Sequence, residues 1–306
     1  MHPAKIASRA ARESQPVLVI AEIGECFNGD MEVARQLIQV ARDAGCDYAK
    51  FQTLDATKIS DDDPERDWFL KISLTAEQIV TLIGYGEQVG IPVLFTPENE
   101  ETAVWLCEQE LQAVKLASSS LVDESLLRYV KNHFSTVFLS TGMGSLDEIN
   151  DAVRCLGEVP HLYVLHCTSE YPTGNLLEQR GLKALASEDV HINMMKMLMQ
   201  LFPQHKVGYS DHTVSTLAPV AAVAAGASVI EKHITLDRET PIHNFHEGGE
   251  YMGTDHVLAL EPDELQEMIR QIREVEVMLG PWRWERSEGE KVLVKFLRGR
   301  FQTQSD

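Results

Sequence analysis

Two kinds of apolar pattern alternate along the chain. Short runs rich in Val, Ile and aromatic residues have the length and composition of β-strands, and longer stretches with apolar residues every three or four positions are typical of amphipathic helices. Eight strands are predicted, at residues 17–24, 47–53, 92–97, 113–118, 136–142, 161–169, 206–212 and 228–236. Strand and helix therefore alternate along most of the sequence.

Amphipathic helices are predicted between these strands, at residues 31–44, 75–89, 123–131, 146–156 and 216–225, with a further helix at 262–279. Thr75 and Ser145 precede two of them and are followed three residues later by Gln78 and Glu148. This is the spacing of a capping box, in which two side chains bind backbone N–H groups at a helix start. A Gly-Pro pair at 280–281 ends the last helix.

Eight strands alternating with helices favour a parallel sheet covered on both faces, and eight is the number that closes a (β/α)8 TIM barrel. A doubly wound open sheet is the structural alternative. The phrases AGCDYAKFQ and AGASVIEKH favour the barrel, because each runs from a helix end through Ala-Gly into a strand that finishes in polar residues. The predicted organisation is an N-terminal extension at 1–16, a barrel at 17–280 and a basic tail at 281–306.

The chain is strongly acidic, because 47 Asp and Glu residues against 27 Lys and Arg give a formal net charge of −20. Such a chain repels phosphate backbones and anionic headgroups, which excludes nucleic acid and membrane surfaces as partners. Apolar residues make up 44% of the chain and can form a core, so wholesale disorder is excluded. An anionic substrate therefore needs a local cluster of positive charge within a site.

The five cysteines are widely spaced and contain no CxxC pair. That pattern favours free thiols in a reducing compartment over a disulfide framework or a zinc knuckle. The N-terminus lacks the continuous apolar stretch of a signal peptide, and no window approaches about 18 uninterrupted apolar residues. We therefore expect a cytoplasmic protein.

Polar residues gather at the predicted strand ends. In a TIM barrel the active site forms at the C-terminal ends of the strands, whereas the barrel interior is otherwise dominated by branched apolar residues. The strand-end residues of interest are Glu22, Lys50, Gln52, Thr96, Lys115, Ser118, Ser140, Ser169, Tyr171, Ser210, His212, Glu231 and His233. Strands that only needed to pack would not repeatedly end in Lys, His, Ser and Glu, so this end is predicted to hold a site.

Lys50 and Lys115 are the most informative cations, because apolar residues flank both of them. The period of two can point each side chain into the barrel, where an unpaired ammonium group is costly. A bound phosphate or carboxylate would remove that cost, whereas the alternative is a surface lysine at a strand edge. Hydroxyl groups that would complete such an anion cradle lie on Thr96, Ser118, Ser140 and Ser210.

His212 and His233 end consecutive strands, so we expect them to be neighbours in a closed barrel. Two imidazoles with water and substrate oxygens suit a divalent ion of the manganese, iron or zinc type. The alternative is a pair of core histidines held by hydrogen bonds. His243, His246 and His256 lie in a segment of low hydrophobicity and are predicted to be solvated or part of a lid.

A series of motifs identifies a family. AEIG with NGD, KFQT, KLAS, LSTGM, LHCTSEYP, GYSDHT, GASVIEKHITLDR and TDHVLALEPDEL follow one another in an order and spacing that resemble the sialic acid synthase family, over about residues 17–280. The resemblance implies a TIM-barrel enzyme that condenses phosphoenolpyruvate with an open-chain N-acylated amino sugar similar to N-acetylmannosamine. The expected products are a sialic acid or related nonulosonate and phosphate. The resemblance also implies a homodimer and a divalent metal, Mn²⁺ in the first place and Mg²⁺ or Co²⁺ as alternatives.

The resemblance also implies a role for each matching residue. The expected phosphoenolpyruvate ligands are Lys50, Thr96, Lys115, Ser118, Ser140 and Ser210, assisted by Ser169. The expected metal ligands are His212 and His233, and the expected sugar contacts are Gln52, Tyr171 and Asp255. The methylene carbon of phosphoenolpyruvate would attack the metal-polarised aldehyde, and Glu22 would stabilise the positive charge that develops on the adjacent carbon. Lys50, Lys115 and His233 would share in catalysis with Glu22.

Four features depart from the family pattern. Cys26 and Phe27 stand where Asn-His is usual, which is expected to remove two polar groups near the site, and Ser119 and Ser120 replace a Gly and an acidic residue. The segment 237–255 is longer than usual. Family members typically continue into an antifreeze-like domain, and the FLRGRF motif resembles the start of that connection.

Two other functions stay open at this point. One is a related synthase that condenses phosphoenolpyruvate with a phosphorylated aldose, as the 3-deoxy-heptulosonate and octulosonate phosphate synthases do. The other is a degenerate barrel that binds a ligand without turnover. The detailed HCTSEYP and GYSDHT match disfavours the first, and the presence of both lysines and both histidines disfavours the second.

Overall fold

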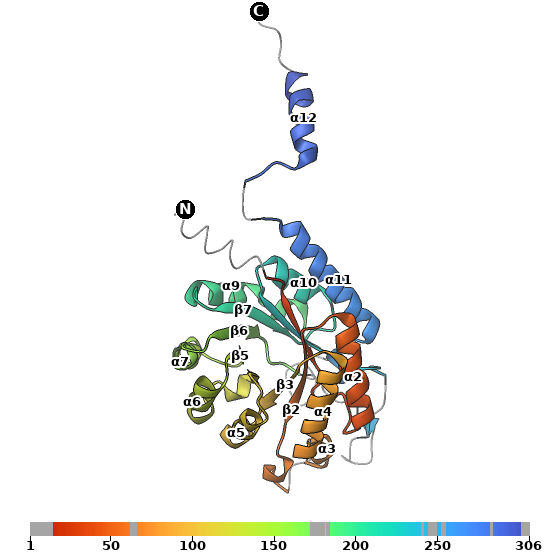
Figure 1. Cartoon of the computed structure of the whole chain (residues 1–306), viewed down its shortest axis with the longest axis vertical. Coiled ribbons are helices and arrows are strands. Elements are labelled where there is room, and N and C mark those ends of the chain that lie inside the picture. The colour runs from red at the N-terminus through yellow and green to blue at the C-terminus, as the bar shows by residue number, and fades with distance from the viewer. Residues whose placement is uncertain are drawn as a thin grey trace, which may run out of the picture. The chain divides into compact units, whose positions relative to one another are not determined.

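All eight predicted strands are present in the computed structural model of the chain, and they lie side by side in one parallel sheet (Figure 1). The structure describes residues 15–61, 66–171, 181, 184–239, 242–243, 250–251, 255–281 and 284–300. The strands are β1 (Leu18–Glu22), β2 (Tyr48–Thr53), β3 (Val93–Pro97), β4 (Ala113–Leu116), β5 (Thr136–Ser140), β6 (His161–Cys167), β7 (Lys206–Asp211) and β8 (Val229–His233).

The strand order closes the sheet on itself. It runs β3-β2-β1-β8-β7-β6-β5-β4, and the first strand pairs with the last in the register Leu18↔Val229. The two ends of this order, β3 and β4, pack side by side and complete the ring. The fold is therefore the predicted (β/α)8 TIM barrel, and the open doubly wound alternative is wrong because its first and last strands would not pair.

Helices surround the sheet (Figure 1). Among the described residues these are α2 (Met31–Ala44), α3 (Arg66–Ile72), α4 (Ala76–Val89), α5 (Glu100–Glu108), α6 (Glu124–His133), α7 (Leu146–Leu156), α9 (Ile192–Leu201), α10 (Leu217–Ala224) and α11 (Pro262–Leu279). A further helix, α12 (Glu288–Gly299), lies in the C-terminal tail. Both predicted capping boxes are confirmed, since Thr75 and Ser145 each exchange hydrogen bonds with the residue three positions on. None of these helices is both long and apolar enough to cross a bilayer.

The barrel and the tail form separate compact units. The first is Val17–Met278, and the second combines Met1–Pro16 with Leu279–Asp306. Within the second unit, α12 was not predicted as a helix. It begins with a capping box in which Ser287 Oγ accepts the Glu290 N–H at 3.1 Å and Glu290 accepts the Ser287 N–H at 2.9 Å.

A buried ion pair connects β7 and β8 on the outer face of the barrel sheet. Lys232 lies between Glu231 and His233 on β8, so strand alternation turns its side chain away from the barrel interior. Its Nζ is 2.6 Å from Asp211 Oδ2, and both side chains are fully buried. Tyr209 donates its hydroxyl to the other oxygen of Asp211 at 2.7 Å.

We expect this pair to be important for stability. Replacing Lys232 with Met leaves the Asp211 carboxylate buried without its counter-ion, which should lower the free energy of unfolding by roughly 3–5 kcal/mol. The matched control is Arg270→Met, whose partners Glu267 and Glu274 are exposed and which should leave stability nearly unchanged. Urea unfolding followed by circular dichroism measures both variants, and equal effects would contradict the importance of the buried pair.

Candidate active site

The barrel interior changes from apolar to polar toward the C-terminal ends of the strands. Its apolar layer is a cluster made of Ile20, Leu94, Phe138, Tyr163, Leu165 and Val229. Two residues further along β1, β5 and β8, the same face carries Glu22, Ser140 and Glu231. Because side chains alternate with a period of two, the strands that build the core also point these polar groups into the barrel mouth.

Both predicted lysines point into this polar layer, and each is 3% exposed. The surface-lysine alternative is therefore wrong. Lys50 forms an ion pair with Glu22, and its Nζ lies 3.7 Å from Glu231 Oε1. Lys115 Nζ lies 3.6 Å from Glu231 Oε2 and donates to Ser140 Oγ at 2.7 Å. The carboxylate of Glu231 thus lies between two buried ammonium groups.

The two lysines are unequally compensated. Burial lowers the pKa of Lys50, but the charges of Glu22 and Glu231 outweigh burial and leave it raised. Burial also lowers the pKa of Lys115, and there the single close carboxylate of Glu231 does not restore it. Ser210 donates to the other oxygen of that carboxylate, Glu231 Oε1, at 3.4 Å. Lys115 is therefore the cation with the greater need for a further anion.

The predicted hydroxyl ligands line the same end of the barrel. Ser118 Oγ accepts the Gly142 N–H at 3.1 Å. A Cβ at Gly142 would lie 2.1 Å from Ser169 Oγ and 2.7 Å from Ser118 Oγ, so only glycine fits between these two serines. Within the described residues, the buried hydroxyl of Thr96 has no hydrogen-bond partner. Several polar groups therefore converge with capacity to bind an anion.

The two predicted histidines are brought together, with ring centroids 5.4 Å apart. Tyr171 OH lies 3.3 Å from His212 Nε2, and in the described part of the chain His212 Nδ1 has no hydrogen-bond partner. Burial, and then the neighbouring His233, lower the pKa of His212 to about 4. His212 is therefore a neutral imidazole near pH 7, which is the form that binds metal ions.

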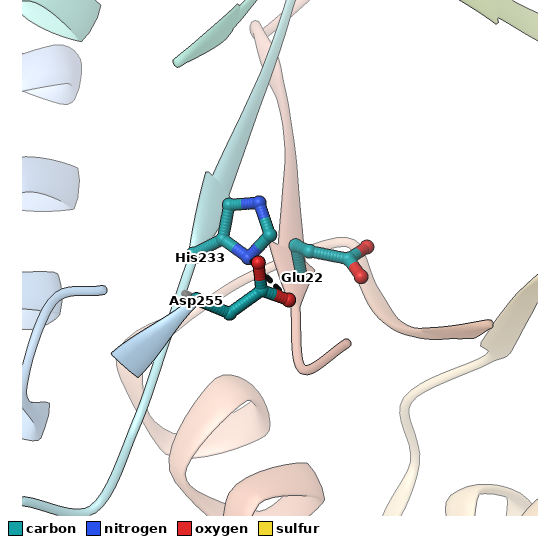
Figure 2. Close-up of side chains that lie close together, drawn as sticks. All are labelled: Glu22, His233 and Asp255. Atoms are coloured by element: carbon teal, nitrogen blue, oxygen red, sulfur yellow. Dashed lines mark ion pairs between the residues drawn. The ribbon is translucent and has the colours of Figure 1, made fainter. Parts of the chain in front are cut away.

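Glu22, His233 and Asp255 form a second close group, shown in Figure 2. Each offers a ligand atom, and these atoms lie within 4.8 Å of one another. His233 Nδ1 is 3.4 Å from Asp255 Oδ2. Burial lowers the pKa of His233, but Asp255 and Glu22 outweigh burial and leave it raised. The three side chains, with His212 beside them, have the imidazole and carboxylate donors that suit a divalent ion of the manganese, iron or zinc type.

Gln52 and Tyr171 border this group. Gln52 Nε2 donates to Glu22 Oε1 at 3.1 Å, while the Tyr171 ring lies 4.5 Å from the ring of His212 and 6.5 Å from that of His233. The two residues are partly exposed, unlike the lysines. Two of the three predicted sugar-contact side chains therefore lie where a ligand entering the barrel mouth would meet them.

Two outcomes differ from the sequence expectation, and two further predictions fall outside the described residues. His256 was predicted to be solvated or part of a lid, but it is 1% exposed and lies 2.9 Å from both Thr235 Oγ1 and Asn28 Oδ1. His246 lies outside the described residues, as does the side chain of His243. Phe27 does not border the site, because its ring packs edge-on against Phe51, 5.9 Å away in the outer core.

Sequence reasoning also missed two residues next to the site. Glu25 accepts the Trp68 indole N–H at 2.7 Å and the Asp255 backbone N–H at 2.9 Å, and both Glu25 and Trp68 are buried. A charged residue in the loop after β1 is a weak signal by itself. Trp68 lies on α3, 43 residues further along the chain, so nothing in the pattern linked the two.

Comparisons with known proteins agree with this geometry. The profile of the NeuB family matches residues 37–283. An N,N'-diacetyllegionaminic acid synthase of Campylobacter jejuni is 31% identical over 92% of this chain and 83% of its own length. The human N-acetylneuraminate-9-phosphate synthase is 31% identical over 87% of this chain and 72% of its own length.

Two solved structures are similar to the chain in both fold and sequence. The N-acetylneuraminic acid synthetase of Leptospira borgpetersenii, crystallised with citrate, superposes with a TM-score of 0.81 at 25% identity, over 94% of each chain. The spore coat polysaccharide biosynthesis protein SpsE of Bacillus subtilis superposes with a TM-score of 0.72 at 31% identity, over 90% of this chain and 72% of that one. The resemblance found in the sequence is thereby confirmed: the chain belongs to the NeuB family and is an N-acetylneuraminate synthase-like enzyme that forms carbon–carbon bonds.

Proposed function

We propose that the chain condenses phosphoenolpyruvate with an N-acylated amino sugar of the N-acetylmannosamine type, giving a sialic acid or related nonulosonate and phosphate. The observation that carries the proposal is the pair of buried lysines beside a histidine and carboxylate group, all at the C-terminal end of one barrel. The names of the relatives, which include legionaminic acid, pseudaminic acid and N-acetylneuraminate 9-phosphate synthases, support a product of this class.

Phosphoenolpyruvate fits the lysine side of the site. It carries a carboxylate and a phosphate, and Lys50 and Lys115 supply two cations for them. The charge of Lys115 is less well compensated than that of Lys50, so Lys115 would bind one of these two anionic groups. The hydroxyls that would hold the remaining oxygens belong to Thr96, Ser118, Ser140, Ser169 and Ser210. The backbone of Gly142 would allow the anion to approach closely, because no side chain blocks it.

A divalent ion fits the histidine side. We propose His212 and His233 as its ligands, with Mn²⁺ as the ion and Mg²⁺ or Co²⁺ as alternatives. The available nitrogen of His212 and the nearby carboxylates supply suitable donors. Burial, and then the charges of Asp255, Glu25 and Glu22, raise the pKa of the Cys26 thiol. When bound, the ion would polarise the aldehyde carbonyl of the sugar.

The protein side chains supply the rest of the chemistry. Gln52, Tyr171 and Asp255 would orient the open-chain sugar so that its aldehyde carbon faces phosphoenolpyruvate. A carbon–carbon bond forms from the methylene carbon of phosphoenolpyruvate to the aldehyde carbon, and positive charge develops on the enol carbon. The Glu22 carboxylate is placed to stabilise that charge. Water then adds to this carbon, and the proton that it loses balances the one taken up by the former aldehyde oxygen, which becomes a hydroxyl. The carbon–oxygen bond to phosphate breaks as the new hydroxyl on this carbon gives up its proton to the departing phosphate and becomes the keto group.

We further propose that the enzyme is a homodimer in the cytoplasm. The homodimer rests on the family resemblance. The cytoplasmic location rests on the free cysteines, which suit a reducing compartment. Static light scattering of the purified chain would show the oligomeric state.

The proposal predicts phosphate release that needs three components. The chain should release phosphate from phosphoenolpyruvate only when Mn²⁺ and an N-acylated hexosamine are both present, and mass spectrometry should find a nine-carbon keto acid. Lys115→Met should lower kcat/KM for phosphoenolpyruvate roughly a hundredfold or more, because it removes a buried cation aimed at the anion. Lys206→Met is the matched control, since this lysine bonds Tyr163 at the opposite end of the barrel.

The sugar panel decides between the functions. It should contain N-acetylmannosamine with and without a 6-phosphate, a 2,4-diacetamido hexose, erythrose 4-phosphate and arabinose 5-phosphate. Turnover of only the last two would replace the proposal with the phosphorylated-aldose function. If no sugar supports phosphate release while phosphoenolpyruvate still binds, the barrel is a non-catalytic binder.

A further prediction concerns the metal ligands. His212→Ala and His233→Ala should each weaken Mn²⁺ binding and lower metal-dependent turnover roughly a hundredfold or more, with the circular dichroism spectrum unchanged. His161→Ala serves as control, because His161 is exposed at the start of β6. Mn²⁺ binding that is unaltered in both variants would refute the assigned ligands.

A further inference from the structure

We propose that Glu25 and Trp68 are positioning residues that hold the Asp255 carboxylate against His233 and so set the affinity of the site for its divalent ion. The inference rests on the proposed function for the presence of that ion. Neither residue belongs to the set of motif residues that the family resemblance assigns to the site.

Glu25 and Asp255 bind each other reciprocally. The Asp255 backbone N–H donates to Glu25 Oε1 at 2.9 Å, and the Glu25 backbone N–H donates to Asp255 Oδ2 at 3.4 Å. Asp255 Oδ2 also lies 3.4 Å from His233 Nδ1. The loop after β1 therefore fixes both the backbone and the side chain of Asp255, with the latter directed at the histidine.

Trp68 completes the arrangement from a third segment. It lies on α3, and its indole N–H donates to Glu25 Oε2 at 2.7 Å. Trp68 is 3% exposed and Glu25 is 9% exposed, so water does not substitute readily for either group. Each oxygen of the Glu25 carboxylate thus accepts an N–H group, one from Trp68 and one from Asp255, and this orients the carboxylate.

The loop after β1 leaves room for the Asp255 carboxylate. Gly24 has a φ of 49°, and a Cβ there would lie 2.3 Å from Asp255 Oδ2. Asn28, four residues further on, lies 2.9 Å from His256 Nε2. Two consecutive residues, Asp255 and His256, are therefore held by one loop. Asp255 is in turn the carboxylate beside His233, a proposed metal ligand. Hydrogen-bonded groups that orient a histidine ligand change metal affinity typically about ten- to a hundredfold when they are removed.

The test uses one nearly isosteric substitution, at Glu25, and one that removes the indole donor, at Trp68. Glu25→Gln keeps one acceptor oxygen but turns an NH₂ group toward one of the two N–H donors, so we expect Mn²⁺ binding about ten- to a hundredfold weaker. Trp68→Phe removes the indole donor together with part of the buried ring and should weaken binding a few-fold, and Trp105→Phe matches the loss of ring volume. The double variant should resemble Glu25→Gln alone, because Trp68 acts through Glu25. Electron paramagnetic resonance of free Mn²⁺ gives the dissociation constants.

Controls separate positioning from general stability. Trp105→Phe alters a half-buried tryptophan on α5 and should leave Mn²⁺ affinity unchanged. The thermal midpoint of each variant is measured without metal. A lowered midpoint with wild-type Mn²⁺ affinity in Glu25→Gln would overturn the inference, and if that variant does not fold, unchanged affinity in Trp68→Phe would do so.

The outcome is also distinct from that of the proposed function. A wild-type chain that binds Mn²⁺ but releases no phosphate with any sugar refutes the synthase activity, yet the variants still test the positioning role through their Mn²⁺ affinities. A wild-type chain that binds no Mn²⁺ overturns the positioning role together with the metal proposal.

Discussion

The position of Glu231 between two buried lysines is the constraint around which the site is organised. Burying three charged groups in a barrel mouth is costly, and the arrangement is tolerated because each charge has an opposite neighbour. The contacts to Lys50 and Lys115 are 3.7 Å and 3.6 Å, longer than those of a tight ion pair. Lys50 has Glu22 as a second partner, whereas Lys115 has no other close carboxylate among the described residues, so the electrostatic need that favours an incoming anion lies at Lys115.

Strands β7 and β8 carry different kinds of charged contact on their inner and outer faces. On the inner face, β8 presents Glu231 and His233 to the site, where groups must remain available to bind ligands. On the outer face, Lys232 forms a buried pair with Asp211, which precedes His212 directly. The Lys232–Asp211 pair therefore lies on the face away from the site, whereas Glu231 makes only long contacts with the two lysines on the face that ligands reach. Strand alternation alone allows this separation within three consecutive residues.

The sequence predicted the barrel well because its strands and amphipathic helices repeat a local pattern, and because period-two alternation places Lys50 and Lys115 inward. It failed where contacts are non-local. α5 has weak amphipathicity and was missed, and His256 lies in a polar segment but is buried by Thr235 and Asn28 from other loops. Glu25 gains its role from Trp68 and Asp255, more than 40 and 200 residues away. Pairings at such separations leave no periodic trace in a single sequence.

The placement of the two loop residues that depart from the family pattern narrows the source of sugar selectivity. Phe27 packs in the outer core, so its ring cannot contact a ligand in the barrel. Cys26 is buried beside the carboxylates, where its raised pKa keeps it a neutral thiol. In this loop the charged group near the ligand side is instead Glu25, which acts on Asp255. Because Phe27 cannot contact a ligand, a substitution in this loop would affect the sugar through the orientation of Asp255.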